Sequence, residues 1–269
     1  MPRPQLLTAQ HLPSLEPFLG ATGTVFRTFT DQDSGCVSYG VEIDGERFFV
    51  KTAATAGTVA SLRRALAVHE VVAHPGLIPI VHSFTTDDGL ALVYPWAEGE
   101  VLYHPTRARN GGRNHPNSAI ARFRRLPLGE VLEALAVVLD VHLAVADADL
   151  VAVDFYDGCT LYDFATSTMR LCDLDEYRPG PFVLEADRLP GSTRYMAPEE
   201  FQRGAVIDQR TTVFSLGRTL RLLLDGGDAE QDWRGTAAQL AVIATATVPN
   251  PVDRYPSVRA LAQEWRAAG

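Results

Sequence analysis

Apolar and polar residues alternate in short runs through the first hundred positions, which is typical of strands in an antiparallel sheet. Five runs have this pattern: 24–30, 36–43, 46–52, 77–83 and 90–94. Asp44-Gly45 predicts a tight hairpin between the second and third run, and a further turn is expected at 87–89. Helical spacing over 61–73 predicts one helix, with Ser61 as its N-cap. The proline-rich residues 1–17 are expected to form an irregular lead-in.

From residue 101 onward the apolar residues recur mainly with the period of helices. Four long helices are predicted: 128–146, 211–224, 237–247 and 257–267, the last capped by Ser257. Short strands are expected within 150–163 and 169–173, and the polar stretch 96–100 separates the two patterns. The pattern therefore predicts an α+β protein. Residues 18–97 would form a small antiparallel β domain with one helix, and residues 98–269 a larger, mainly helical domain.

Composition and charge narrow the class of protein. The chain has 269 residues, 46% of them hydrophobic, and a net charge of −9, so we expect a globular protein that does not bind nucleic acid. The three cysteines form no CxxC pair and no disulfide framework, which indicates a reducing compartment. The sequence shows no signal peptide and no uninterrupted apolar span, so we expect a cytoplasmic protein without membrane association.

Basic residues are distributed unevenly. Lys51 is the only lysine, and the other 23 basic residues are arginines. In its predicted strand, Lys51 and Phe49 point to one side of the sheet and Val50 to the other. The presence of a lysine ammonium at this single position, with arginine at every other basic position, indicates a specific role for Lys51.

Six of the arginines lie within residues 101–127, which contain no acidic residue and are expected to be an inserted loop with a short helix. Two interpretations of the arginine-rich part, 107–125, remain open. It is a solvated loop, or it is a docking surface for an acidic partner.

Several segments resemble, in order, the motifs of protein kinases. They are FFVK at 48–51, VAVD at 151–154, LCDLD at 171–175, GSTRYMAPEE at 191–200, VFSLG at 213–217 and NPVDRYP at 250–256. The chain therefore resembles the protein kinase superfamily over about residues 18–267, and is most similar to bacterial Ser/Thr kinases with divergent glycine-rich and catalytic loops. The resemblance implies a bilobal kinase-like fold, with a nucleotide-binding β lobe and a helical lobe that carries the catalytic and activation segments.

The resemblance also implies a set of roles, with ATP and Mg²⁺ as cofactors. Lys51 would hold the phosphates, Asp154 would orient the acceptor hydroxyl, and Asp173 would bind Mg²⁺. Adenine would lie at the hinge, whose residues are Tyr94, Trp96 and Ala97.

The activation segment carries two further expectations. Ser192 would lie beside the catalytic site, and the segment as a whole favours protein substrates over small molecules. Glu199 would pair with Arg254 in a buried bidentate bridge that stabilises the fold.

The phosphate-binding loop departs from the family pattern. In the preferred register Gly35 and Val37 occupy the last glycine and valine positions, with Thr30 and Gln32 at the earlier glycines. A second register would use Gly20 and Gly23 instead. In the preferred register, Asp31 and Asp33 would repel phosphate unless they point away.

The catalytic loop, and the residues expected to support it and Lys51, also depart from the family pattern. Cys159 stands where the family has a metal-binding asparagine, and a thiol is a poor ligand for Mg²⁺. Asp157 or Asp175 is expected to provide the second metal contact instead. Glu70 is either the partner of Lys51 or a solvated helix end, and Thr212 replaces an aspartate that would accept a structural hydrogen bond.

Three functions are compatible with these patterns. The first is an ATP- and Mg²⁺-dependent kinase of protein serine or threonine, which the retention of Lys51, Asp154 and Asp173 favours. The second is a pseudokinase that serves as a nucleotide-responsive binding scaffold. The third is a small-molecule kinase whose acceptor pocket would be built by the 101–127 insert.

Overall fold

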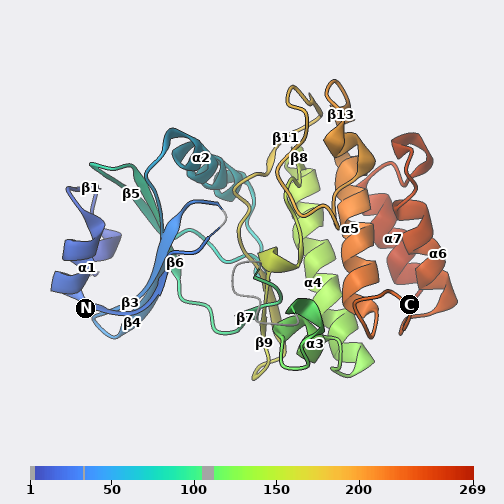
Figure 1. Cartoon of the computed structure of the whole chain (residues 1–269), viewed down its shortest axis with the longest axis horizontal. Coiled ribbons are helices and arrows are strands. Elements are labelled where there is room, and N and C mark those ends of the chain that lie inside the picture. The colour runs from blue at the N-terminus through green and yellow to red at the C-terminus, as the bar shows by residue number, and fades with distance from the viewer. Residues whose placement is uncertain (1–3, 33, 105–111) are drawn as a thin grey trace. The chain divides into compact units, whose positions relative to one another are not determined.

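The computed structural model describes residues 4–32, 34–104 and 112–269, and these form two compact units. The first unit holds residues 4–70 and 78–98. The second holds 71–77, 99–104 and 112–269. The described residues form a mixed α+β fold with a six-stranded sheet and seven α-helices, so the predicted α+β class is confirmed (Figure 1).

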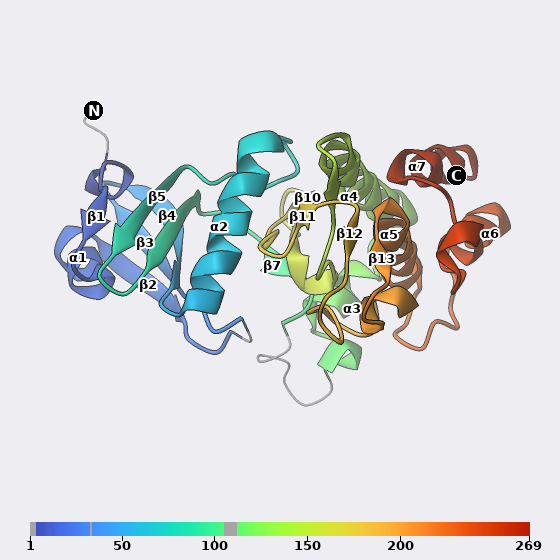
Figure 2. The ribbon, with the colours of Figure 1, turned by 90° about the horizontal axis from the view of Figure 1, so that it is seen from above.

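The first unit is built on the six-stranded sheet, whose strands lie in the order β1-β5-β6-β4-β3-β2 (Figure 2). The strands are β1 His11–Leu12, β2 Thr24–Phe29, β3 Val37–Ile43, β4 Glu46–Ala53, β5 His82–Thr86 and β6 Leu90–Pro95. All neighbours are antiparallel except β1 and β5. The predicted hairpin between β3 and β4 is confirmed: Asp44 and Gly45 have φ of 53° and 79°, as a type I′ turn requires.

One strand begins later than predicted. The run 77–83 was expected to be extended throughout, but β5 begins at His82. Pro79 cannot donate to a strand ladder, and Leu77 instead forms an isolated bridge with Leu171 inside the second unit.

The lead-in is ordered, which corrects the prediction for residues 1–17. Its described part forms a 3₁₀ turn over Gln5–Leu7, strand β1, and the start of helix α1 Leu15–Thr22. Pro17 lies in the first turn of α1, where its missing N–H costs no hydrogen bond. Leu6, Leu15 and Leu19 complete a core against one face of the sheet.

The single predicted helix of this unit is α2, Ala56–Val71. It begins five residues before Ser61, so Ser61 is not its N-cap. Thr55 and Thr58 cap it instead, because each backbone N–H donates to the other's hydroxyl, at 3.0 and 3.2 Å. Figure 1 shows α1 and α2 on opposite faces of the sheet.

The second unit is mainly helical. Its helices are α3 Ala119–Phe123, α4 Leu128–Asp147, α5 Gln209–Leu224, α6 Ala237–Ala246 and α7 Val258–Ala267. The four predicted long helices are therefore confirmed, and Ser257 caps α7 by accepting from the Ala260 N–H at 3.1 Å. Helix α5 packs against α4, α6 and α7, and α7 also packs directly against α4.

Short strands carry the loops of the second unit. They are β7 Glu100–Val101, β8 Leu150–Val151, β9 Thr160–Asp163, β10 Thr168–Leu171, β11 Arg178–Pro179, β12 Phe182–Val183 and β13 Val206–Ile207. Strands β8, β9 and β10 fall inside the predicted 150–163 and 169–173 regions or overlap them. Across the described ranges, no helix has the length and apolar character needed to cross a membrane.

Candidate functional site

Two aspartates in the second unit have a backbone conformation that non-glycine residues rarely adopt. Asp154 follows β8 and Asp173 follows β10, and their φ angles are 61° and 62°. A left-handed conformation costs a non-glycine residue of order 1 kcal/mol or more, and such residues cluster at functional sites. Both were predicted site residues.

The structure brings these two aspartates together around Cys159. The Cys159 thiol donates to the Asp154 carbonyl oxygen at 3.3 Å, and the Cys172 N–H, next to Asp173, donates to the Cys159 carbonyl at 2.9 Å. Burial raises the pKa of Cys159 well above its ordinary value, and the negative charges of Asp173 and Asp154 raise that pKa further. Cys159 is therefore a protonated thiol, unsuited to bind Mg²⁺. Its hydrogen bond supports the backbone of Asp154.

The segment 191–200 lies against Asp154. Gly191 has φ of 146°, and a Cβ there would lie 3.6 Å from Asp154 Oδ1 and 3.0 Å from Met196 Sδ. Ser192 is half-buried, and its carbonyl accepts from the Tyr195 N–H at 2.8 Å. The local close approach of Gly191 is what places this segment beside the carboxylate of Asp154.

The predicted bridge between Glu199 and Arg254 is confirmed. Nη1 and Nη2 of Arg254 donate to the two carboxylate oxygens of Glu199 at 2.7 and 2.9 Å, and both side chains are buried. Arg254 also donates to the carbonyls of Arg210, Val248 and Pro249. One guanidinium thus fastens the segment 191–200 to the helical part of the unit.

Thr212 forms a structural hydrogen bond at the position where the resemblance predicted that the replacement of an aspartate would weaken one. Its hydroxyl accepts from the Ala152 N–H at 3.1 Å, and both groups are buried. Helix α5 therefore still supports the chain two residues before Asp154.

A second support comes from α4. His142 is fully buried, its Nδ1 lies 2.8 Å from the Val138 carbonyl, and its Nε2 lies 2.8 Å from the Tyr177 hydroxyl. The carbonyl can only accept, so Nδ1 carries the proton and Nε2 accepts from Tyr177. Burial lowers the pKa of His142 to about 4, so the ring is neutral at neutral pH. The ring also packs on Phe155, next to Asp154, with centroids 4.3 Å apart.

Asp157, one of two predicted substitutes for the metal-binding asparagine, faces an arginine. Its oxygens accept from Nε and Nη2 of Arg113 at 2.7 and 2.9 Å. Metal binding by Asp157 would have to displace this bidentate pair. The other predicted substitute, Asp175, is buried two residues after Asp173.

The arginine-rich insert is only partly described, because residues 105–111, with Arg107 and Arg109, lie outside the described residues. In the described part, Arg113 binds Asp157, Arg122 binds Glu100 at 2.6 Å, and Arg124 is buried against the Leu222 carbonyl at 2.9 Å. These three arginines are bound within their own unit: Arg113 and Arg124 are largely covered, whereas Arg122 and Glu100 form an exposed pair. Docking of an acidic partner at the insert stays a prediction.

Lys51 lies in the first unit, on β4. Val50 is part of the core that α1 covers, so Lys51 points to the opposite face, as the alternation predicted. The Lys51 side chain is only 6% exposed. Glu70 is exposed in the last turn of α2 and forms no ion pair among the described residues, so of the two alternatives it fits the solvated helix end.

The remaining predicted nucleotide contacts also lie in the first unit. Gly35 has φ of 73° in the loop between β2 and β3, where its N–H donates to the Gln32 carbonyl at 3.0 Å. Gly20 lies inside α1 and Gly23 ends that helix, so the second glycine register is wrong. Tyr94 is buried and Trp96 is half-buried against Phe26, with ring centroids 4.8 Å apart. Asp33 lies outside the described residues.

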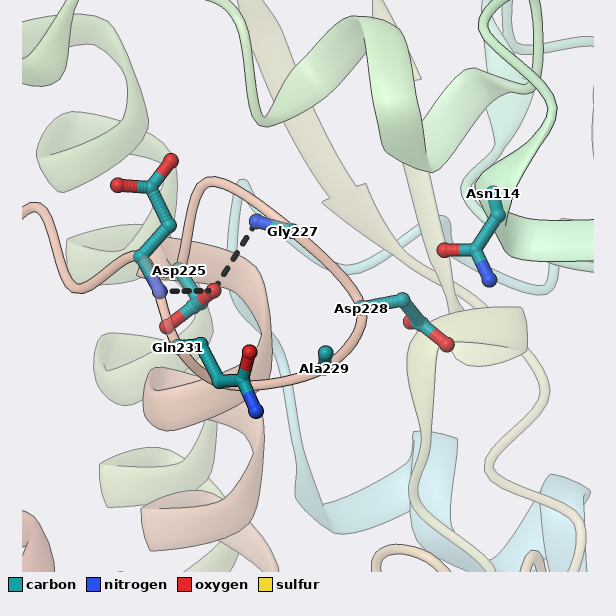
Figure 3. Close-up of a pocket in the computed structure, with 7 residues that line it drawn as sticks. Asn114, Asp225, Gly227, Asp228, Ala229 and Gln231 are labelled. Atoms are coloured by element: carbon teal, nitrogen blue, oxygen red, sulfur yellow. Dashed lines mark hydrogen bonds between the residues drawn. The ribbon is translucent and has the colours of Figure 1, made fainter.

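A pocket of about 330 Å³ lies elsewhere in the second unit, between loop 225–232 and Asn114 (Figure 3). Two of its aspartates, Asp225 and Asp228, already have partners. Asp225 accepts from the N–H groups of Gly227 and Asp232 at 3.0 and 3.2 Å, and Asp228 pairs with Arg124 and Arg194. None of the predicted site residues lines this pocket.

No known family model matches the chain, and no curated protein sequence matches it either. In the described parts of both units, no group of three or more His, Cys, Asp or Glu side chains is arranged to hold a metal ion by itself.

Proposed function

We propose that the chain is an ATP-dependent phosphotransferase of the protein kinase type, with a bilobal kinase-like fold, that acts on serine or threonine of proteins. The observation that carries this proposal is the arrangement around Asp154. Two aspartates in left-handed conformation meet at one buried thiol, and the segment 191–200 lies against the first of them. These are the positions at which the resemblance to kinases places the base, the metal ligand and the activation segment.

Asp154 and Asp173 fit a magnesium ion that arrives with a nucleotide. Mg²⁺ prefers oxygen ligands, and it is usually held by one or two carboxylates together with phosphate oxygens and water. A cluster of three protein ligands is therefore not required. Asp173, with Asp175 in support, would hold the ion, which would neutralise charge on the phosphates during transfer.

The chain's own residues would supply the other roles in phosphoryl transfer. Asp154, fixed by Cys159 and by the support from Thr212, would accept a hydrogen bond from the acceptor hydroxyl and orient it. Lys51, the only lysine, would place a compact positive charge on the phosphates. Phosphoryl transfer needs mainly positioning and charge stabilisation, and these residue types supply both.

The segment 191–200 supports a protein substrate. It is fastened at one end by the Glu199–Arg254 bridge and lies against Asp154 at the other. Such a platform suits an extended peptide. The three free thiols of the chain support a reducing compartment, and we propose the cytoplasm.

A second candidate is a nucleotide-responsive binding scaffold without turnover. Cys159 favours it, because a buried, protonated thiol stands where the family has a metal-binding amide. This scaffold would bind nucleotide and transfer no phosphate.

One experiment separates the two. Transfer from Mg²⁺-ATP to generic protein acceptors is measured for the wild type, Asp154→Asn and Lys51→Arg. Asp149→Asn is the matched control, because Asp149 is an exposed aspartate that is also left-handed, with φ of 54°. We expect transfer in the wild type and in the control, and loss of about 100-fold or more in the other two. Absence of transfer together with a nucleotide-dependent rise in melting temperature would instead support the scaffold.

A further inference from the structure

Asp157 is held in an unusual setting for a carboxylate. It opens the 3₁₀ turn Asp157–Cys159, directly after Asp154-Phe155-Tyr156, and it is 0% exposed. A buried carboxylate is strongly unfavourable unless it is paired and hydrogen-bonded. Arg113 supplies that pairing with two hydrogen bonds at 2.7 and 2.9 Å.

Arg113 is itself fixed from several directions. Its guanidinium stacks on the Tyr103 ring, 3.4 Å from the centroid, and its carbonyl accepts from the Ser118 hydroxyl at 2.9 Å. Ser118 also caps α3 by accepting from the Ala121 N–H. Burial opposes the charge of Arg113, but the hydrogen bonds and charge of Asp157 outweigh it and hold the pKa of Arg113 above its ordinary value. The pair is therefore a rigid contact between the insert and the loop of Asp154.

From Asp157 the contact continues to Asp154. The Asp157 carbonyl accepts from the Thr160 hydroxyl at 2.8 Å, and the Cys159 N–H donates to the Tyr156 carbonyl at 2.9 Å. These bonds close the turn and place the Cys159 thiol against the Asp154 carbonyl, at 3.3 Å. The turn that Arg113 fixes thus carries a thiol that holds the backbone of Asp154.

Asp157 also lies close to the segment 191–200. Burial raises the pKa of Tyr195 well above its ordinary value, and the charge of Asp157 raises it further. The rings of Tyr156 and Tyr195 meet edge to face, with centroids 6.4 Å apart. The Asp154 loop therefore contacts the segment 191–200 through these two rings, and the charge of Asp157 acts on Tyr195 of that segment.

We infer that Arg113 and Asp157 are positioning residues for Asp154, and that Asp157 is not a metal ligand. The inference rests on the proposed function, because it assigns a role in the same reaction. The insert would then be a working part of the site: it sets the conformation of the loop from which Asp154 projects. Asp175 would remain as the second metal contact.

The test uses the full chain with Arg113→Gln, Arg113→Lys, Asp157→Asn and the double variant Arg113→Gln with Asp157→Asn. Arg122→Gln is the matched control, because Arg122 also pairs with a carboxylate, that of Glu100, but this pair is exposed and includes no residue of the Asp154 loop. Steady-state transfer gives kcat, the KM for ATP and the Mg²⁺ concentration for half-maximal rate. Amide hydrogen exchange of residues 154–160 is measured without nucleotide.

We expect Arg113→Gln and Asp157→Asn to lower kcat about 10- to 100-fold, since small misplacements of a catalytic group cost that much. The KM for ATP and the half-maximal Mg²⁺ concentration should stay within about twofold of wild type, because these residues would touch neither ligand. Exchange of 154–160 should accelerate. Arg113→Lys keeps the charge without the planar fork and should fall between wild type and Arg113→Gln. Arg122→Gln should behave as wild type.

Several results would overturn the inference. One is that Arg113→Gln has the same kcat, and the same amide exchange of residues 154–160, as the control Arg122→Gln. Another is that Asp157→Asn raises the Mg²⁺ concentration for half-maximal rate tenfold and leaves the amide exchange of residues 154–160 unchanged. That result would make Asp157 a metal ligand. If Arg113→Gln does not fold, the double variant, which leaves no unpaired buried charge, decides in the same way. If the wild type transfers no phosphate, the proposed function fails, and the exchange of 154–160 alone decides whether Arg113 orders the loop.

Discussion

Arg254 is fully buried in its side chain, so its replacement by alanine removes five hydrogen bonds at once. Two go to Glu199, and three go to the backbone carbonyls of Arg210, Val248 and Pro249. Removing one partner of a buried ion pair costs about 3–5 kcal/mol, because the other charge stays buried without compensation. Since the carbonyls also lose their donor, we expect Arg254→Ala to lower the free energy of unfolding by about 4–5 kcal/mol.

Two further variants make this prediction specific. Glu199→Gln leaves Arg254 its three carbonyl acceptors, so we expect a smaller loss of about 2–3 kcal/mol. Arg259→Gln removes an exposed pair with Asp147, in which both side chains are more than half exposed, and should cost under about 1 kcal/mol. Guanidinium unfolding is followed by tryptophan fluorescence, to which Trp265, buried in α7, contributes. A loss for Arg254→Ala no larger than that for Arg259→Gln would refute the reasoning.

Two other predictions concern the supports of Asp154. The pKa of His142 is lowered to about 4 in the folded protein, whereas an unfolded histidine takes up its proton near 6.5, so only the unfolded state gains a proton between these values. The free energy of unfolding should therefore fall by up to about 3 kcal/mol as pH drops from 6.5 to 4, and this group should not affect it above pH 6.5. Denaturant unfolding of wild type and His142→Gln across this pH range measures the effect. Equal pH slopes for the two proteins would contradict the prediction. Thr212→Val removes the acceptor of the Ala152 N–H and should lower the free energy of unfolding by about 1–3 kcal/mol. Thr212→Ser keeps the hydroxyl and should lower it less. The same unfolding assay compares the two variants, and equal losses would show that the hydroxyl does not provide the stabilisation.

Features that depend on local patterns could be predicted from the sequence. The alternation around Lys51 fixed which face of β4 it lies on, and the Asp44-Gly45 hairpin followed from the need for positive φ at both positions. The bridge between Glu199 and Arg254 joins positions 55 apart, yet it was predictable because both residues lie in recognisable motifs.

Other features depend on contacts that no local pattern encodes. Arg113 and Asp157 are 44 positions apart, and nothing distinguishes Arg113 from its five neighbouring arginines in the insert except what it meets in the folded chain. The proline content of the lead-in concealed α1, because Pro17 is tolerated only at the specific place it takes in the first turn. The start of α2 was missed because Ala56 and Gly57 carry no apolar signal.

The position of Lys51 has a practical consequence. It is the only lysine, so an amine-selective reagent has one side-chain target in the whole chain. That target lies on β4, paired on both sides by β3 and β6, and is almost completely covered. Acylation of Lys51 therefore requires a local motion that uncovers this side chain, and the rate of labelling measures how often that face of β4 becomes accessible.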